Sequence, residues 1–366
     1  MFPQNAEIRS SDIPASRWRL FGQSLLERNI RLLRQAGAKR IFLDLNESDM
    51  QFFVKKVLRH VAPLSGIEIV TGRCSHSEYL SMTANQFILF SAFSDLEGNF
   101  TAKEGILEPV TRRDQHEVRD DSDFIALRKY AIEVIRTGSG GKIAQNINKR
   151  ISIPISLVLA RFRVIPNLIT FVNFLMGALA IYLIAAGGHA GQAAGGILIQ
   201  ACSVVDGCDG EVARMTTRFS KLGGIFDTVS DQMLAVALII TALSKVFVNY
   251  SFAVFIFTMI ALTGGAAAMF GIIIYFMRRY SESMSMASFN REFIDLLPQT
   301  DYLARAMRYL QYLTRKELYS MFVCVFCLFN AIHIYAVAFA VIVAVGVLLM
   351  FALAFRYFPG MKRVQR

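Results

Sequence analysis

Hydrophobic and polar positions divide the chain into two parts with different periodicities. In residues 1–136 short apolar runs alternate with amphipathic stretches, whereas from residue 164 onward the apolar runs become much longer. A helix needs about 20 apolar residues to cross a bilayer core. The pattern therefore predicts a small cytoplasmic α/β domain (residues 1–136) followed by an α-helical integral membrane domain (residues 164–358).

The first part alternates predicted helices and strands. Leu26, Ile30 and Leu33 recur at helical spacing, with Ser24 as an N-cap and Gly37 as the stop. This alternation is typical of a mainly parallel sheet. Further helices are expected at residues 48–61, 76–83 and 122–136 and strands at 41–45, 67–72 and 86–92, with residues 1–20 forming a tail or a frayed first strand.

Residues 137–163 connect the two parts. The sequence TGSGG at 137–141 is a turn-rich linker. Residues 142–163 are basic and amphipathic, which predicts a helix on the inner membrane surface, broken near Pro154. The apolar stripe of this helix has a four-residue spacing and consists of Ile143, Ile147, Ile151, Ile155 and Leu159.

The second part contains enough apolar sequence for six membrane spans. Residues 318–355 alone would form about 57 Å of helix, nearly twice a bilayer core, so a turn is expected near Asn330 to Tyr335. Most Lys and Arg residues that flank the spans fall on one side, which places both termini in the cytoplasm and the protein, multi-pass, in the inner membrane. Residues 359–366 form a basic tail. The expected spans are about 167–186, 190–212, 222–245, 250–277, 317–333 and 335–355.

Composition supports a membrane protein. Hydrophobic residues make up 54% of the chain, the mean hydropathy is +0.42 and the net charge is +11. The basic residues gather at the ends of apolar runs, as contacts with anionic lipid headgroups require. No recognised nucleic-acid-binding module is visible, so membrane lipids are expected partners and nucleic acid is not.

Four aspartates lie within or beside two of the apolar segments. Asp206 and Asp209 are three residues apart and Asp227 and Asp231 are four apart, so each pair shares one helix face. Carboxylates at the edge of a bilayer are costly without compensating cations. The pattern predicts a site for divalent metal ions at the inner membrane surface.

The spacing around these aspartates is specific. It resembles, position for position, the DxxDGxxAR-x8-GxxxDxxxD signature of the CDP-alcohol phosphotransferases, also called CDP-alcohol phosphatidyltransferases. The resemblance covers roughly residues 145–358, including the amphipathic helix and the IPNLIT sequence that begins the first span. It implies transfer of a phosphoalcohol group, typically phosphatidyl, from a CDP-alcohol to a hydroxyl acceptor with release of CMP. The matching positions are Asp206, Asp209, Gly210, Ala213, Arg214, Gly223, Asp227 and Asp231.

The resemblance also implies roles for individual residues. The four aspartates would hold two Mg²⁺ or Mn²⁺ ions, and Asp231 would also act as the general base on the acceptor hydroxyl. The positions implied for substrate binding are Gly210, Ala213, Arg214, Gly223, Asn167 and Thr170. Candidates for binding an anionic acceptor, each of which could equally anchor the protein at lipid headgroups, are Arg161, Arg163, Lys221, Arg315 and Lys316.

The sequence LFGQSLLERNIRLLRQAGAKRIFL (residues 20–43) resembles the first helix and following strand of sugar-phosphate nucleotidyltransferase domains. Those enzymes need a glycine-rich loop with basic residues after the first strand, because backbone N–H groups and cations cradle the triphosphate. Residues 1–21 contain no glycine. We therefore interpret residues 1–136 as a degenerate domain, inactive in nucleotide transfer, that serves as a scaffold or partner surface.

The expected setting is phospholipid biosynthesis, with CDP-diacylglycerol as donor and an alcohol or polyol phosphate as acceptor. An alternative is a bifunctional or inositol-phosphate-type synthase that uses CDP-inositol. The alternatives from other classes are a divalent-cation transporter, with the aspartates as a transit site, and a scaffold with two inactive domains. The family resemblance implies a homodimer, for which Gly264, Gly265 and Ala266 to Ala268 offer a close-packing helix face.

Overall fold

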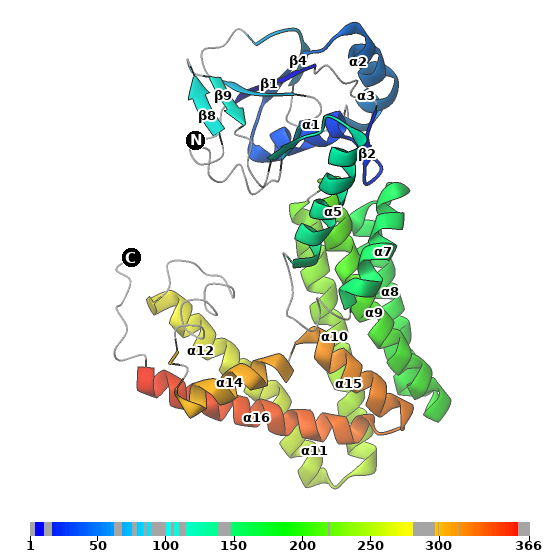
Figure 1. Ribbon diagram of the computed structural model, residues 1–366. Helices are drawn as coiled ribbons and strands as arrows, with labels where there is room; N and C mark the ends of the chain where they lie inside the picture. Colours follow the sequence, from blue (N-terminus) through cyan, green and yellow to red (C-terminus); the bar gives the residue numbers. More distant parts are fainter. Residues whose placement is uncertain are drawn as a thin grey trace. The chain divides into compact units, whose positions relative to one another are not determined.

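The chain forms two compact units, Met1–Ile169 with Gly207–Gly224 and Thr170–Asp206 with Ile225–Arg366. The first unit contains the α/β domain and the second contains most of the predicted membrane domain (Figure 1). The computed structural model describes residues 4–10, 17–61, 68–74, 79–83, 86–88, 100–103, 106–109, 115–137, 148–218, 220–280, 297–298, 300–313 and 315–357.

A six-stranded sheet forms the centre of the α/β domain. Its order is β5 (Glu68–Thr71), β4 (Arg40–Asp44), β1 (Asn5–Arg9), β6 (Tyr79–Thr83), β9 (Ile106–Pro109) and β8 (Phe100–Lys103). All neighbours run parallel except β8, which is antiparallel to β9. The predicted α/β class and mainly parallel sheet are confirmed. Two smaller sheets pair β2 (Arg19–Leu20) with β3 (Gln23–Ser24), and β7 (Gln86–Ile88) with β10 (Gln115–Glu117).

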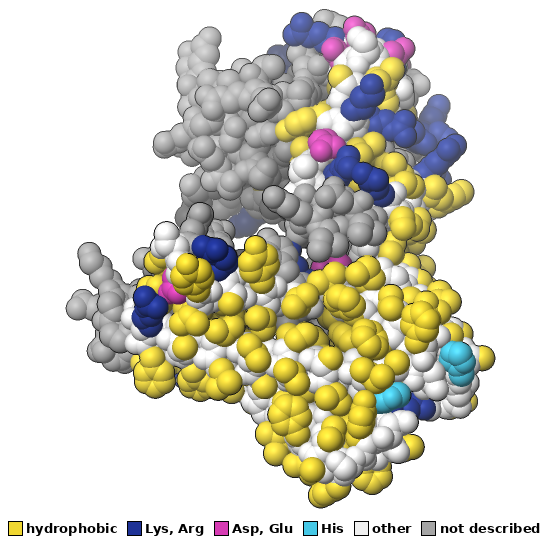
Figure 2. All heavy atoms as spheres, turned by 60° about the horizontal axis from the view of Figure 1, so that its bottom comes forward, with side chains coloured by type: hydrophobic (Ala, Val, Ile, Leu, Met, Phe, Trp, Pro, Cys, Tyr) yellow, Lys and Arg dark blue, Asp and Glu magenta, His cyan; other side chains and the backbone are white. Residues whose placement is uncertain are grey.

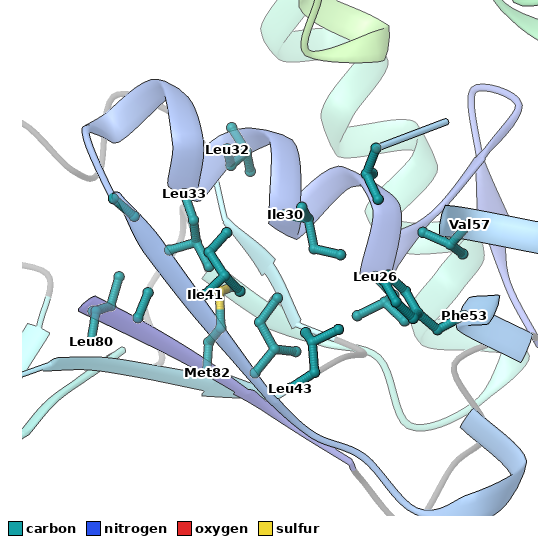
Figure 3. Packing of buried hydrophobic residues seen from close by; sticks show 14 residues of the cluster. Leu26, Ile30, Leu32, Leu33, Ile41, Leu43, Phe53, Val57, Leu80 and Met82 are labelled. Carbon is teal, nitrogen blue, oxygen red and sulfur yellow. The ribbon is translucent and has the colours of Figure 1, made fainter. Parts of the chain in front are cut away.

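Helix α1 (Leu25–Ala36) packs its apolar face on this sheet. Leu26, Ile30 and Leu33 are fully buried in one cluster with residues of β4, among them Ile41 (Figure 3). The Ser24 side chain accepts a hydrogen bond from the Glu27 backbone N–H, and Gly37 ends the helix with a φ of 111°. Both predicted caps are confirmed. The other predicted helices appear as α2 (Glu47–Phe52), η1 (Phe53–Val57) and α3 (Leu58–Val61), and as α5 (Asp121–Thr137).

Three expectations for this domain need correction. Asn5–Arg9 do form the first strand, β1, but it is not frayed: it pairs with β4 on one side and β6 on the other, with Ala6 and Ile8 fully buried. The helix expected near residues 76–83 is wrong, because Tyr79–Thr83 are the strand β6. In β6 the alternating Leu80 and Met82 both join the core, which a strand inside a sheet permits. The strand expected at 86–92 begins as β7, but it pairs with β10 in a separate sheet, and residues 89–92 lie outside the described part.

Helix α7 (Asn148–Arg161) continues through Pro154, so the predicted break is wrong. Pro154 lies on an exposed face of the helix. On the buried face, Ser152 and Ser156 on either side of the proline both donate hydrogen bonds to Glu211, which holds the helix on both sides of Pro154. Ile151 and Ile155 of the predicted apolar stripe are also exposed, as a helix lying on a membrane surface requires. The opposite, buried face contains Ser152, Ile153, Ser156 and Ala160.

Four helical stretches are long and apolar enough to cross a membrane. They are Pro166–Ala186, Leu222–Asn249, Phe252–Phe276 and Ile332–Tyr357, and they confirm four of the six predicted spans. Large hydrophobic side chains are exposed along them (Figure 2). The helices of this part are α8 (Pro166–Ala186), α9 (Gly188–Thr216), α10 (Lys221–Asn249), α11 (Phe252–Met259), η3 (Ile260–Gly264), α12 (Gly265–Tyr280), α14 (Tyr302–Leu313), α15 (Lys316–Leu328) and α16 (Ile332–Tyr357).

The other two predicted spans, at 190–212 and 317–333, are not confirmed. Helix α9 has 29 residues, but its C-terminal part carries several charged side chains. Helix α15 has only 13 residues, or about 20 Å of helix, which is shorter than a bilayer core of about 30 Å. The predicted turn between the last two apolar segments is confirmed, because Asn330, with a φ of 56°, lies between α15 and α16.

The small residues predicted to form a dimer face are partly used inside the protein. A side chain added to Gly265 would approach Val343 of α16 to 2.7 Å. Gly265 therefore lets α12 and α16 pack closely. Gly264, Ala266 and Ala267 are exposed, and the dimer remains a prediction.

Candidate functional site

Three of the four predicted metal-binding aspartates lie together. Asp206 is in the C-terminal half of α9, and Asp227 and Asp231 are one turn apart near the start of α10. One carboxylate oxygen of each lies within 4.8 Å of the other two. Negative charges at this separation repel one another unless a cation lies between them. Carboxylate oxygens are the ligands that Mg²⁺ prefers, so these side chains fit a divalent metal ion.

Lys316, the first residue of α15, is placed among these carboxylates. Its Nζ donates hydrogen bonds to Asp206 Oδ1 at 2.6 Å and to Asp231 Oδ1 and Oδ2 at 2.6 and 2.7 Å. Its ammonium group therefore links α9, α10 and α15. Lys316 stays a predicted acceptor-binding residue.

Asp209 lies three residues after Asp206 on α9, in the part of the helix that belongs to the first unit. Its side chain is buried, and its Oδ1 accepts a hydrogen bond from the Gly210 backbone N–H at 2.5 Å. Asp209 stays a predicted metal ligand.

Glu211 is a functional candidate that the sequence analysis missed. Its carboxylate accepts hydrogen bonds from the Oγ atoms of Ser152 and Ser156 on α7, each at 2.7 Å, and its side chain is buried. Hydrogen bonds to an ionised carboxylate are stronger than neutral ones. They attach α7 to the motif helix α9. Two sequence features could have indicated this contact: an acidic residue in an otherwise apolar helix, and two serines four residues apart on α7.

Arg214 lies against Gly210 one turn away. A Cβ atom on Gly210 would lie 3.2 Å from Arg214 Nη1. The buried Nε of Arg214 has no hydrogen-bond partner among the described residues. Ala213 accepts a backbone hydrogen bond from Arg218 at the end of α9. An arginine with an unused donor beside a glycine is suited to binding phosphate oxygens.

Gly223 and Asn167, two predicted substrate-binding residues, are in contact. A Cβ atom on Gly223 would overlap the Asn167 side-chain oxygen. The Gly223 backbone N–H also donates to Ser220 Oγ at the start of α10. The absence of a side chain at Gly223 thus lets α8 and α10 approach at this point. Thr170, one turn after Asn167 on α8, is buried.

The release of CMP that the family resemblance implies should fall severalfold in Gly223→Ala, because an added Cβ atom would displace the exposed Asn167 side chain from its contact with this glycine. Gly224→Ala is the matched control, since a Cβ atom there meets nothing within 4 Å. Initial rates and thermal unfolding of the two variants provide the measurement. Equal rates for the two variants would show that the contact between Asn167 and Gly223 does not support activity.

The predicted acceptor residues occupy different environments. Arg161 and Arg315 are exposed. Arg163 instead donates to Glu27 Oε2 of α1 at 2.9 Å, and so joins the α/β domain to the end of α7. The side chain of Lys221 lies outside the described part, and Lys316 is paired with the aspartates.

An apolar cavity of about 180 Å³ lies in the second unit. A smaller cavity of about 40 Å³ reaches Asp231 and Lys316. The two share Ala235, Leu238 and Tyr319 in their linings, so apolar space adjoins the charged site. The larger cavity is otherwise lined by Ile239, Ala242, Leu262, Val323, Ile332, Tyr335, Ala336 and Phe339.

Comparison with known proteins shows the family of the chain. The family model for CDP-alcohol phosphatidyltransferase matches residues 163–350, just over half of the chain. A "Bifunctional IPC transferase and DIPP synthase" of Archaeoglobus fulgidus is 36% identical over 130 residues, which cover 34% of this chain and 26% of that protein. A protein with the same name from Aquifex aeolicus is 35% identical over 117 residues, which cover 32% of this chain and 26% of that protein. One from Thermococcus kodakarensis is 36% identical over 106 residues, which cover 29% of this chain and 23% of that protein. The match therefore spans about a quarter of each relative. The chain belongs to the CDP-alcohol phosphatidyltransferase family.

Proposed function

We propose that the protein transfers a phosphatidyl or similar phosphoalcohol group from a CDP-alcohol to a hydroxyl acceptor in phospholipid biosynthesis, with the aid of divalent metal ions. The observation that carries this proposal is the grouping of Asp206, Asp227 and Asp231 from two helices of the family motif. The acceptor oxygen forms a bond to the phosphorus that bears the alcohol. The bond between that phosphorus and the CMP oxygen breaks, and CMP leaves with the electron pair.

Residues of the site have separate roles in this reaction. Asp231 takes the proton from the acceptor hydroxyl. Arg214 holds a phosphate oxygen of the donor, and the contact between Asn167 and Gly223 shapes the space for the nucleotide. Bound Mg²⁺ or Mn²⁺, two ions by family resemblance, would be held by Asp206, Asp209, Asp227 and Asp231 and would neutralise charge on the phosphoryl oxygens and departing CMP.

The apolar cavity supports a lipid substrate. Burying a lipid chain in this cavity would contribute about 0.8 kcal/mol of binding free energy for each CH₂ group removed from water. The cavity adjoins the smaller one that reaches Asp231. A chain whose headgroup is held at Asp231 can extend into this space. This favours CDP-diacylglycerol as donor over a wholly water-soluble one.

Filling the cavity should therefore change chain-length preference. We expect Ala336→Leu, in the cavity lining, to lower the rate with long-chain CDP-diacylglycerol about tenfold and to affect a short-chain analogue much less. Ala340→Leu is the control for overpacking, because Ala340 is fully buried one turn further along α16. Rates measured with both donors check this expectation. An equal loss with long and short chains in Ala336→Leu would remove the support for a lipid in this cavity.

An inositol-phosphate-type synthase that uses CDP-inositol is the second candidate. The relatives named as bifunctional IPC transferase and DIPP synthase favour it. Because they match over about a quarter of their length, their whole activity is not transferred to this chain. Rates with CDP-inositol and CDP-diacylglycerol distinguish the two candidates.

We propose that the α/β domain is a scaffold. Residues 1–21 lack the glycines of a triphosphate-binding loop, and the domain is attached to the motif helix. Gln23 Nε2 donates to the Thr216 carbonyl and Gln35 Nε2 to the Thr217 carbonyl, each at 2.7 Å. These bonds occupy carbonyl groups at the end of α9 that a helix leaves without partners. We further propose a homodimer in the inner membrane with cytoplasmic termini.

The test is an assay of the purified full-length protein with Mg²⁺ or Mn²⁺, both donors and a panel of alcohols and polyol phosphates. We expect CMP release that requires a donor, an acceptor and a divalent metal. If no combination gives CMP release or CDP-alcohol binding, the proposal is wrong. Incubation with CTP and a sugar phosphate, without a CDP-alcohol, tests the α/β domain, for which no product is expected.

A further inference from the structure

All three N–H donors of the Lys316 ammonium group have an aspartate oxygen as partner. A lysine ammonium has three N–H donors, and the structure gives it three carboxylate oxygens, one from Asp206 and two from Asp231, at 2.6–2.7 Å. The three side chains are only partly exposed, at 32% for Lys316, 24% for Asp206 and 30% for Asp231. Partial burial weakens the screening by water and strengthens these ion pairs.

The oxygens that Lys316 contacts belong to the carboxylates grouped for a metal ion. A metal ion and an ammonium group at the same carboxylates repel each other, so the presence of one weakens the binding of the other. Lys316 begins α15 and carries its charge on a flexible four-carbon chain. The ammonium can therefore leave the carboxylates while the helix stays in place.

We propose that Lys316 is a tethered cation that competes with the divalent metal for Asp206 and Asp231. Without metal, Lys316 cancels the repulsion between the aspartates and keeps α9, α10 and α15 together. When metal binds, the ammonium is displaced and its donors become available for phosphate oxygens of the substrate. The presence of Lys316 thus weakens metal binding. This inference rests on the proposed metal site.

The test is Mn²⁺ binding to the purified full-length protein without substrate, measured by electron paramagnetic resonance of free Mn²⁺. We expect Lys316→Met to bind Mn²⁺ about tenfold more tightly than the wild type, because a competing cation is lost. Its melting temperature without metal should fall and should recover when Mn²⁺ is added. A lysine that only held the helices in place would give the opposite result, because its removal would disorder the carboxylates and weaken binding.

Two further variants make the test decisive. Lys316→Gln keeps most of the length and the hydrogen bonding but not the charge, so it should tighten Mn²⁺ binding even if Lys316→Met does not fold. Lys245→Met is the control, since Lys245 Nζ donates to the Ala185 carbonyl at 2.8 Å, and its Mn²⁺ affinity should equal that of the wild type. Unchanged or weaker Mn²⁺ binding by the folded Lys316 variants would overturn the inference while leaving the proposed function intact. A wild type that neither binds Mn²⁺ nor releases CMP would overturn both.

Discussion

Asp231→Asn is expected to lower CMP release at least about a thousandfold. General-base catalysis contributes about 10²–10⁴-fold, and this change also removes a charged oxygen from the group formed with Asp206 and Asp227. Asparagine has nearly the same size as aspartate, so the loss reflects chemistry rather than packing. Initial rates at saturating donor, acceptor and Mg²⁺ provide the measurement.

Asp301→Asn is the matched control for this substitution. Asp301 lies in the same unit, but its carboxylate accepts a hydrogen bond from Tyr357 and pairs with Arg356 at 3.5 Å. The hydrogen bond from Tyr357 and the nearby Arg356 lower the pKa of Asp301. We expect Asp301→Asn to keep its rate within a few-fold of the wild type. Activity of Asp231→Asn within tenfold of the wild type would rule out Asp231 as the base.

Glu27→Ala is expected to have the largest effect on stability. The Glu27 side chain is almost completely buried and pairs with Arg31 at 3.3 Å and with Arg163 at 2.9 Å. Burial lowers the pKa of Arg31, and the charge of Glu27 opposes this shift. Removing Glu27 leaves two arginines without their counter-charge, and breaking a buried pair in this way costs about 3–5 kcal/mol. Hydrogen exchange of α1 and thermal unfolding of the whole protein measure the loss.

Glu68→Ala provides the comparison for an exposed ion pair. Glu68 and Arg40 are joined at 2.8 Å, but their side chains are 61% and 52% exposed. Exposed pairs contribute about 0–1 kcal/mol. Glu68→Ala should therefore leave hydrogen exchange of α1 almost unchanged. A similar effect of both substitutions would show that the pair between Glu27 and Arg163 does not attach the α/β domain to α7.

The sequence predicted elements of the α/β domain where local periodicity decides the structure. Leu26, Ile30 and Leu33 form a helical face, and the strand at 41–45 begins with three consecutive apolar residues. Tyr79–Thr83 were misassigned because a short apolar segment fits a helix or a buried strand equally well, and pairing with distant strands decides between them. The central position of β1 likewise depends on β4 and β6.

Hydropathy identified the four helices that are long enough and, on average, apolar enough to cross a membrane. Hydropathy could not show whether α9 crosses the membrane, because Asp206, Asp209 and Glu211 lower the hydropathy of its C-terminal half. Hydropathy also extended the predicted span at 317–333 past the end of α15 into the turn at Asn330, because helix and turn lie in one apolar stretch. The break expected at Pro154 is absent for a different reason, since contacts of Ser152 and Ser156 with Glu211 hold α7 on both sides of the proline.

The sequence predicted those parts of the candidate site whose residues lie close together in the chain, at helical spacing. Asp227 and Asp231 share one face of α10, and the motif linked them to Asp206. Lys316 is 110 residues from Asp206, and Ser152 is 59 residues from Glu211. Contacts between helices so far apart depend on how the helices pack, which no local pattern specifies. The convergence of these groups within an enzyme family weakens the transporter and scaffold alternatives.

The central claim is that this site joins an alcohol-bearing phosphorus to an acceptor hydroxyl as CMP leaves. Phosphorus NMR of a reaction containing the purified protein, a CDP-alcohol, an acceptor and Mg²⁺ measures both products at once. We predict a phosphodiester and CMP in equal amounts, with neither formed after chelation of Mg²⁺ or by Asp231→Asn. CMP without a phosphodiester, or a phosphodiester formed equally well without divalent metal, would contradict the account.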